Sequence, residues 1–526
     1  MKKIEVGTST FAKLIEADNI YVDKTDIIYN IITSGSTFFF CSRPRRFGKT
    51  LTLSTLEEIF KGNKELFKGL KIYDTDYDWK EYPVVRLDLS KINASTPKAL
   101  ETQLNEKLFA IAEQYGVSFK HSRYCNANLD SLIIALSQKG KVVVLIDEYD
   151  NILSNNINNP RVEALREVLK GFFSVIKADS DYMQFVFITG VTKFSKVSIF
   201  SSMNNLIDLS FIREYATLFG YTEEEVKHYF SEYIEEGIKR TGLSYAEYMA
   251  KLEKKYNGNR FSPDSEITVY NPVSIGLFFF YGGEKFNNYW VDTGGTKLLM
   301  DIAKEVRFDI SKDLDTPVRR ASIANFDILE MASKRISKIK YMTLLQQSGY
   351  LTIKEILDKN GNLLRLDFPN DEVEEAYSVI LLDVYTDGSG SEYFEPSELY
   401  TAFDDGDAEK AIRILKAIYS SVPYDLEKHR EADFSAMFHC MLKAIGARIQ
   451  SEAETSRGRA DAIVETSNDI YIIEFKLDKN ADEALSQIHE TKYYEPYLAG
   501  KKKVHLIGIN FSSSEKNINE WKEEIL

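Results

Sequence analysis

The sequence is poor in the residue types that mark several classes of protein. Its three cysteines, Cys41, Cys125 and Cys440, are widely scattered, which excludes a disulfide framework and a cysteine metal site and indicates a reducing compartment. Its six histidines are never spaced at i, i+4, which argues against a zinc hydrolase. The apolar run Ile275–Phe280 is far too short to span a membrane, and Met1–Gly7 lacks the apolar core of a signal peptide. We therefore expect a cytoplasmic protein with no membrane partner.

The sequence also lacks an excess of basic residues. Its net charge is −14 at pH 7, which disfavours nonspecific coating of nucleic acid, so any such contact must come from a local groove. Hydrophobic residues make up 44% and charged residues 28%, as in ordinary folded proteins. A chain of 526 residues is too long for one hydrophobic core and predicts about three domains.

The segment Arg43–Thr50 carries the clearest motif. It follows an apolar, strand-like run, Phe38–Cys41, and precedes a helix-like stretch, Leu51–Phe60. A strand, a loop ending in Gly-Lys-Thr and a helix together bind nucleotide phosphates, because backbone N–H groups at the helix start face the anion. Arg43 stands where this motif usually has its first glycine, and a basic surface turn is the alternative interpretation. The residues predicted to bind the nucleotide here are Arg45, Arg46, Phe47, Gly48, Lys49 and Thr50, with Lys49 on the terminal phosphates and the Thr50 hydroxyl on Mg²⁺.

A second motif supports the first. Lys141–Asp150 begins as a β-branched strand and ends in adjacent carboxylates, of which Asp147 is predicted to hold Mg²⁺ and Glu148 to polarise the attacking water. Helix capping is the alternative role for both acids. A further strand, Gln184–Thr189, has the form of one that lies between the first two in many ATPases. Thr189 or Thr192 is then a candidate sensor of the γ-phosphate, although a threonine that ends a strand often has no such role.

Strands and helices alternate in the first part of the chain. Pro83–Leu89 reads as a strand, and Leu100–Ala112 and Val162–Ile176 have helical periodicity. This pattern predicts a doubly wound, mostly parallel sheet. From Thr222, which opens a capping box, helices predominate and are expected to form a lid.

Later segments predict a hairpin and a linker. Leu345–Ile353 and Leu363–Phe368 read as its two strands, and Thr386–Glu392 is rich in Gly, Ser and acid. We expect three domains: a nucleotide-binding core (1–215), a mainly helical extension (216–385) and a C-terminal domain with a helical lead-in (386–526).

The C-terminal domain contains a second chemical cluster. Arg457–Val464 and Ile470–Lys476 read as strands joined by a turn, which brings Asp461 towards Glu474 and Lys476. Two carboxylates on one face suit Mg²⁺ or Mn²⁺, and an ammonium group beside the metal can position a water for attack on phosphorus. Gln487, on the helix that follows, is expected to face the same site. Solvated cross-strand ion pairs are the alternative.

These motifs together resemble one family. Tyr21–Thr25, the phosphate loop, Leu145–Asp150 and Ile188–Lys193 are similar to bacterial AAA-ATPase-like proteins, and so are Glu214–Thr217 and Tyr256–Phe261. Arg459–Asp461 with Glu474–Lys476 resembles the PD-(D/E)XK nuclease superfamily. The resemblance implies an α/β P-loop NTPase core, a helical extension and a C-terminal restriction-endonuclease-like domain. It further implies that Lys49, Thr50, Asp147 and Glu148 form the nucleotide site and that Asp461, Glu474 and Lys476 form the nuclease site. Glu452 and Glu454 are additional candidate ligands, with solvated strand-edge acids as the alternative.

Three functions are compatible with the sequence. The first is an ATPase coupled to a metal-dependent nuclease that acts on nucleic acid, with DNA favoured. The second is an ATP-dependent switch or scaffold whose C-terminal domain binds nucleic acid or a partner without cleavage, and the third is a nucleotide-binding interaction protein. The chain is a possible homo-oligomer. The candidate phosphate or inter-subunit contacts are Arg45, Arg46, Lys193, Arg213 and Arg260.

Overall fold

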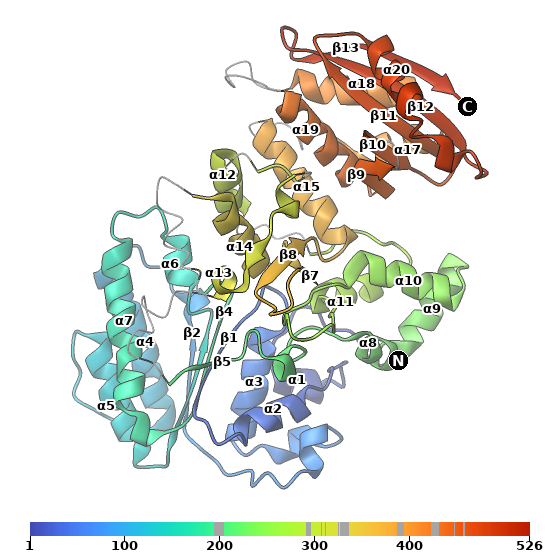
Figure 1. Ribbon diagram of the computed structural model, residues 1–526. Helices are drawn as coiled ribbons and strands as arrows, with labels where there is room; N and C mark the ends of the chain where they lie inside the picture. Colours follow the sequence, from blue (N-terminus) through green and yellow to red (C-terminus); the bar gives the residue numbers. More distant parts are fainter. Residues whose placement is uncertain are drawn as a thin grey trace. The chain divides into compact units, whose positions relative to one another are not determined.

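The chain forms two compact units (Figure 1). The N-terminal unit comprises Met1–Trp290 and Pro317–Asn370, and the C-terminal unit comprises Val291–Thr316 and Asp371–Leu526. The structure, a computed structural model, describes residues 1–193, 203, 205–290, 296–306, 308–310, 312–324, 326, 336–386, 394–421, 431–446, 448–455 and 458–526.

The N-terminal unit is built on the predicted parallel sheet. The order across the sheet is β2 (Val84–Asp88), β3 (Val142–Asp147), β4 (Met183–Gly190), β1 (Phe38–Ser42) and β5 (Ile207–Asp208). The strand that carries Thr189 therefore lies between β1 and β3, as predicted. All the described strand pairs of this sheet are parallel, and β1, β2 and β3 are each followed by helices that cover a face of the sheet. Strands β1 and β3 are buried along their whole length, as the runs of Phe, Val and Ile predict.

Helices cover both faces of this sheet (Figure 1). One group lies on one face and consists of α1 (Phe11–Glu16), α2 (Thr25–Ile32) and α3 (Lys49–Phe60). The other face carries α4 (Pro97–Tyr115), α5 (Cys125–Ser137) and α7 (Val162–Ala178), with α6 (Asn151–Asn155) after β3. The predicted doubly wound sheet is confirmed.

Short 3₁₀ helices in this part are η1 (Lys64–Phe67), η2 (Lys71–Asp74), η3 (Leu89–Lys91), η4 (Ser180–Tyr182) and η5 (Arg213–Tyr215).

The rest of the N-terminal unit is mainly helical. The capping box at Thr222 is present, since its side chain accepts from Glu225 N and the Glu225 carboxylate accepts from Thr222 N. The helices are α8 (Glu223–Tyr229), α9 (Ser231–Thr241), α10 (Tyr245–Tyr256), α11 (Pro272–Phe280), α13 (Arg320–Ala324) and α14 (Lys338–Ser348). A small antiparallel sheet contains β6 (Val318–Arg319), β8 (Leu363–Asp367) and β7 (Thr352–Ile356), in that order.

The predicted hairpin is correct only in its second half. Leu345 belongs to α14 and not to a strand, and β7 begins at Thr352. The helix ends because Gly349 adopts a φ of +93° and Tyr350 N donates back to Leu345 O, which is a helix-terminating arrangement. Beyond it, Asp358 accepts from the backbone of the second strand and closes the predicted turn.

The C-terminal unit contains a mixed sheet of five strands, in the order β13, β12, β11, β10, β9. β11 and β12 are parallel and are connected through a helix, while the other neighbours are antiparallel. The strands are β9 (Arg448–Thr455), β10 (Gly458–Glu465), β11 (Asp469–Leu477), β12 (Lys503–Ser512) and β13 (Asn517–Ile525). The predicted hairpin between β10 and β11 is confirmed.

Apolar clusters lie on both faces of the mixed sheet. The larger packs Tyr471, Ile473 and Phe475 against helices, and the smaller packs Ile470 and Ile472 against the connecting helix. The helices of this unit are α12 (Thr296–Val306), α15 (Asp371–Tyr385), α17 (Pro396–Asp404), α18 (Ala408–Ser420), α19 (Glu431–Ala444) and α20 (Ala481–Thr491), with η6 (Asp313–Asp315) and η8 (Glu495–Tyr497).

The three predicted domains stay a prediction. By their contacts, α12 and α15 belong to the same compact unit as the C-terminal sheet, although both fall within the predicted helical extension. Apart from Thr386, the predicted linker lies outside the described residues.

Candidate functional site

The phosphate loop connects the end of β1 to the start of α3, as its sequence predicts. Arg43 N donates to Gly190 O of the neighbouring strand and fixes the loop to the carboxyl edge of the sheet. Gly48 precedes Lys49, the first residue of the helix, whose free N–H groups and dipole favour an anion. The local fold is therefore that of a phosphate-binding loop.

Lys49 is buried within its own loop. Its Nζ donates to Arg43 O at 2.9 Å and to Pro44 O at 2.8 Å. Burial lowers the pKa of Lys49, and the nearby Asp147 and Glu148 carboxylates oppose that shift. Carbonyl groups thus hold the ammonium group at the loop, near two acids. At this position its positive charge could balance the negative charge of a terminal phosphate.

Arg43, which replaces the usual glycine, has a structural role. It is buried, and its guanidinium group donates to Ser42 O at 2.9 Å and to Ser210 O at 2.8 Å. The same group lies over the Phe261 ring, 4.3 Å from its centre. Burial lowers the pKa of Arg43. The side chain therefore points into the protein and ties the loop to Ser210, just after β5, and to Phe261.

The carboxylates after β3 meet the loop at the same edge of the sheet. Asp147 is buried, and its Oδ1 accepts from the Thr189 hydroxyl at 2.7 Å and from Glu148 N at 3.0 Å. Thr189 is itself fully buried, and its hydrogen bond orients the Asp147 carboxylate. The two residues predicted from separate motifs are thus one hydrogen-bonded pair.

Glu148 lies on the cavity side of this edge. Its backbone has a φ of +48°, a strained conformation for a residue with a side chain, and such strain is often found at functional sites. Burial raises the pKa of Glu148, opposed by Lys49. A carboxylate with a raised pKa beside a phosphate loop has the properties of a general base.

Asp150 secures the segment that follows β4. Its carboxylate accepts from Thr192 N and from the Thr192 hydroxyl, both at 2.7 Å. Tyr149 donates its hydroxyl to Thr192 O at 2.9 Å. Thr192, the second candidate sensor, is therefore buried and engaged in structural hydrogen bonds.

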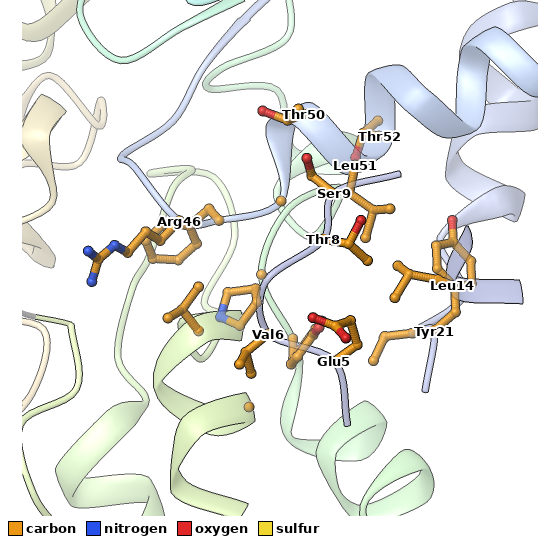
Figure 2. A pocket seen from close by; sticks show the side chains of 18 of the residues that line it. Glu5, Val6, Thr8, Ser9, Leu14, Tyr21, Arg46, Thr50, Leu51 and Thr52 are labelled. Carbon is orange, nitrogen blue, oxygen red and sulfur yellow. The ribbon is translucent and has the colours of Figure 1, made fainter. Parts of the chain in front are cut away.

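A cavity of about 270 Å³ opens beside the phosphate loop (Figure 2). The loop and helix residues that line it are Arg46, Phe47, Gly48, Lys49, Thr50, Leu51 and Thr52, together with Glu148. The Arg46 guanidinium group points away from the cavity and donates to Trp290 O at 3.2 Å. Arg45, Asp147 and Thr189 do not line this cavity.

Two of the other basic candidates are engaged inside the unit. Lys193 is buried and forms an ion pair with Asp208 at 2.7 Å. The Arg260 guanidinium group donates to Ser265 O at 2.5 Å and to Pro263 O at 2.9 Å. Arg213 is exposed on η5, and its charge, after that of Arg320, helps to lower the pKa of Asp264.

The predicted C-terminal residues converge at one place. Asp461 Oδ2 accepts from Phe475 N at 2.8 Å, which places this carboxylate beside Glu474. Lys476 Nζ donates to Glu474 Oε1 at 3.2 Å and to Gln487 Oε1 at 2.6 Å. Two strands and α20 therefore bring two carboxylates, an ammonium group and an amide together.

Glu474 has the environment of a metal ligand. It is 2% exposed, and its Oε2 has no hydrogen-bond partner among the described residues. Burial and then the Asp461 carboxylate raise the pKa of Glu474 to about 7. A divalent cation would satisfy the unpartnered oxygen and relieve the repulsion between the two acids. The residues present therefore fit a cation such as Mg²⁺ or Mn²⁺.

The remaining candidates around this site are only partly described. Arg457 lies outside the described residues, and Glu452 and Glu454 lie on β9, where the side chains are outside what the structure describes. Among the described residues, no group of three or more His, Cys, Asp or Glu side chains is placed to hold a metal. The described donor set is thus two carboxylates, which suits Mg²⁺, since Mg²⁺ usually retains several waters.

The fold and the two clusters define the class of protein: a P-loop α/β domain in a chain with a restriction-endonuclease-like α/β domain. Residues 5–200 match the family described as "Predicted AAA-ATPase", and residues 429–521 match the PD-(D/E)XK nuclease superfamily. An "Uncharacterized protein in vnfD 5'region" of Azotobacter chroococcum mcd 1 is 32% identical over 530 residues, which cover 98% of each chain. The chain belongs to the family of AAA-ATPase-like proteins with a C-terminal PD-(D/E)XK nuclease superfamily domain.

Some residues at the N-terminal site were not predicted. The cavity is also lined by Ile4–Ser9, Lys24 and Tyr221, which come from separate parts of the sequence. Lys24 forms a buried ion pair with Glu225, with Nζ 2.6 Å from Oε2. The only sequence signal near these residues is the motif Tyr21–Thr25, which resembles the family without indicating a role.

No described helix is both long and apolar enough to cross a membrane.

Proposed function

We propose that the N-terminal unit binds Mg²⁺–ATP and hydrolyses it. The observation that carries this proposal is the cavity of about 270 Å³ that both the phosphate loop and Glu148 line. Lys49 and the N–H groups at the start of α3 bind the phosphates. The Thr50 hydroxyl and Asp147 hold Mg²⁺, which neutralises charge on the phosphates.

Glu148 acts as the general base in this proposal. It orients the attacking water and takes its proton, and its raised pKa increases its affinity for that proton. Thr189 keeps the Asp147 carboxylate oriented through its hydroxyl donation. Arg45 precedes the helix and is proposed to add positive charge around the phosphates, whereas the Arg46 guanidinium group points away from the cavity and donates to Trp290 O.

We also propose that the C-terminal unit cleaves a phosphodiester bond of nucleic acid, with DNA favoured. Asp461 and Glu474 hold Mg²⁺ or Mn²⁺, which supplies Lewis-acid activation of the phosphate. Lys476 positions the attacking water and offsets charge that develops at phosphorus. Gln487 fixes the Lys476 ammonium group at 2.6 Å and so acts as its positioning residue.

The test uses the purified full chain. Mg²⁺–ATP should raise the melting temperature of the wild type, and Lys49→Ala should abolish that rise. Labelled DNA and RNA, incubated with Mn²⁺ and ATP, should be cut by the wild type and by neither Asp461→Asn nor Lys476→Ala.

The alternative function has its own result. If the wild type binds ATP and nucleic acid but cuts neither DNA nor RNA, the protein is an ATP-dependent switch or scaffold. Equal thermal shifts in the wild type and in Lys49→Ala would remove the phosphate loop as the nucleotide site.

A further inference from the structure

The motif Tyr256–Phe261 resembles the family in sequence but takes part in neither proposed site. Its first residue, Tyr256, is the last residue of α10. None of its residues, all of which the structure describes, lines the cavity beside the phosphate loop. The remaining five residues, Asn257–Phe261, which we call the linking segment, contact the phosphate loop at one end and the residues before α15 at the other.

The loop end of the linking segment is Phe261. Its ring meets the Phe47 ring edge to face, with the ring centres 5.2 Å apart. The Arg43 guanidinium group lies 4.3 Å from the centre of the same Phe261 ring. Phe47 also lines the cavity that is proposed to hold the nucleotide. A ligand in that cavity would therefore lie against a residue that contacts the linking segment directly.

The other end of the linking segment is packed against the residues that precede α15. Gly258 has a φ of +103°, and a Cβ added there would collide with Pro369 O. Asn370 Nδ2 donates to Asn257 O at 2.7 Å. Asn370 is the last residue of the N-terminal unit at this crossing, and α15 of the C-terminal unit begins at the next residue, Asp371. The linking segment is thus fixed to the point where the chain leaves the N-terminal unit.

Hydrogen bonds on two sides hold the middle of the linking segment. Val269 N donates to Asn259 O at 2.9 Å, and Asn259 N donates to Val269 O at 3.3 Å. Arg260 N donates to the Thr352 hydroxyl of β7 at 2.8 Å, and that hydroxyl donates back to Arg260 O at 3.1 Å. Because the backbone is held on both sides, a displacement of one end is passed along the segment to the other end.

The two ends differ in how much room they have. Arg43, Phe261 and Gln346 line a small cavity of about 20 Å³. Arg43 Nε and Gln346 Oε1 are buried in the protein and have no hydrogen-bond partner among the described residues. A shift of the loop that paired this donor with this acceptor would satisfy both groups, so a second arrangement is available at the loop end. At Gly258 the backbone of Pro369 leaves no comparable space.

We propose that the linking segment regulates the C-terminal unit by carrying the nucleotide state of the phosphate loop to the start of α15. Nucleotide binding fixes Phe47, the linking segment follows through Phe261, and the two residues before α15 move with it. This inference rests on the proposed binding of ATP at the phosphate loop. Of the three places where the chain passes between the units, it assigns the regulatory role to residues 370/371.

The experiment measures hydrogen exchange of the α15 amides in the full chain, with and without Mg²⁺–ATP. In the wild type, ATP should slow this exchange on the order of tenfold, because the start of α15 opens less often once the linking segment is fixed. Asn370→Asp removes the donor to Asn257 O, while aspartate caps a helix as well as asparagine does. It should bind ATP like the wild type in calorimetry, but ATP should no longer slow exchange in α15. Gly258→Ala should have the same effect, because its Cβ displaces Pro369.

Matched controls separate this effect from a general loss of structure. Asn105→Asp also removes a buried amide donor, which reaches Arg123 O at 3.2 Å from α4. Gly242→Ala places a Cβ at a φ of +70°, where no atom lies within 4 Å. In both controls ATP should slow exchange in α15 as it does in the wild type. Lys49→Ala should show neither ATP binding nor slower exchange.

The possible outcomes separate this inference from the proposed function. If the wild type binds ATP but exchange in α15 does not change, or if it slows equally in Asn370→Asp, the inference is wrong and the proposed function stands. Loss of ATP binding in Asn370→Asp would also contradict the inference, since the linking segment would then belong to the nucleotide site. If Gly258→Ala does not fold, Asn370→Asp decides alone. If the wild type binds no ATP, the proposed function fails and the inference fails with it.

Discussion

Glu148 and Glu474 are carboxyl groups with raised pKa values, one in each unit, and in both the main cause is burial. Their surroundings differ in a way that predicts different behaviour. Glu148 faces the Lys49 ammonium group across a cavity, whereas Glu474 has a second carboxylate beside it and an oxygen without a partner among the described residues. The first environment suits proton transfer and the second suits a cation.

For Glu148 we predict a loss of turnover without a loss of binding. Glu148→Gln should keep the thermal shift caused by Mg²⁺–ATP, because Lys49, Thr50 and Asp147 are unchanged. Its rate of ATP hydrolysis should fall by roughly 10²–10³-fold, since the general base is gone. Phosphate release measured at saturating ATP checks this. Glu163→Gln, on the exposed face of α7, should hydrolyse ATP normally; a normal rate in Glu148→Gln would leave Glu148 a structural role only.

For Glu474 we predict a stability that falls as the pH rises. The pKa of its carboxyl group is about 7 in the folded protein against 4.5 ordinarily, so the folded state holds the proton longer than the unfolded state. The cost of ionising this buried group therefore develops between about pH 4.5 and pH 7 and is complete above that range. Glu474→Gln should melt like the wild type at pH 5 and a few degrees higher at pH 8.

Added Mn²⁺ gives the complementary measurement. It should raise the melting temperature of the wild type at pH 8 and have little effect on Glu474→Gln, because the variant has lost a ligand. Glu483→Gln, an exposed change on α20, serves as the control and should respond to Mn²⁺ like the wild type. A wild type that Mn²⁺ does not stabilise at pH 8 would contradict the proposed cation site.

Residues within linear motifs could be predicted, and residues brought together by folding could not. Lys49 and Asp147 were predicted because strand, loop and acid follow each other in a recognisable order. Glu474, Lys476 and Gln487 were predicted because a two-residue spacing and a following helix fix which side chains share a face. The place of Ile4–Ser9 in the cavity wall was not predicted, because an irregular segment has no periodicity that shows which surface it will cover.

At the scale of elements, the end of α14 shows the same limit. Leu345–Ile353 contains enough apolar residues for a strand, but the glutamines and the glycine that follows favour a helix with a glycine stop. The local composition is compatible with both a strand and a helix, and packing in the folded unit selects the helix. In the folded unit Gly349 lies against Pro44 of the phosphate loop, with an added Cβ only 2.7 Å from Pro44 Cβ.

This contact predicts how two similar glycines differ. Gly349→Ala and Gly116→Ala both place a side chain at positive φ, but at Gly116 no atom lies within 4 Å of the added Cβ. Gly116→Ala should cost about 1 kcal/mol from backbone strain alone. Gly349→Ala should cost about 1–3 kcal/mol more, because Pro44 must move. Urea unfolding of both variants gives the comparison, and equal costs would show that the helix end and the loop are not packed as the structure indicates.

The change at Gly349 should also affect the nucleotide site. Pro44 O accepts a hydrogen bond from Lys49, so a displaced Pro44 disturbs the position of the ammonium group. Gly349→Ala is therefore expected to weaken ATP binding, whereas Gly116→Ala, at the end of α4, should leave it unchanged. Calorimetry with Mg²⁺–ATP measures both.

At the scale of the whole molecule, the described residues of each candidate site belong to one unit. All the residues that line the cavity belong to the N-terminal unit, and Asp461, Glu474, Lys476 and Gln487 belong to the C-terminal unit. The chain nevertheless passes from one unit to the other at residues 290/291, 316/317 and 370/371. These three covalent connections offer a route by which the nucleotide state of one unit can bias the other.

This arrangement leads to a prediction about coupling that uses two variants of the same site. Lys49→Ala cannot reach the ATP-bound state, whereas Glu148→Gln should accumulate it. If the ATP-bound state permits cleavage, then Glu148→Gln should cut labelled DNA with ATP and Mn²⁺ at least as fast as the wild type, and Lys49→Ala should cut it more slowly by about tenfold. Asp461→Asn should abolish cleavage in each background. As a single variant it should hydrolyse ATP like the wild type, because it changes only the C-terminal unit. Equal cleavage by Lys49→Ala and Glu148→Gln, with or without ATP, would show two independent activities that share one chain.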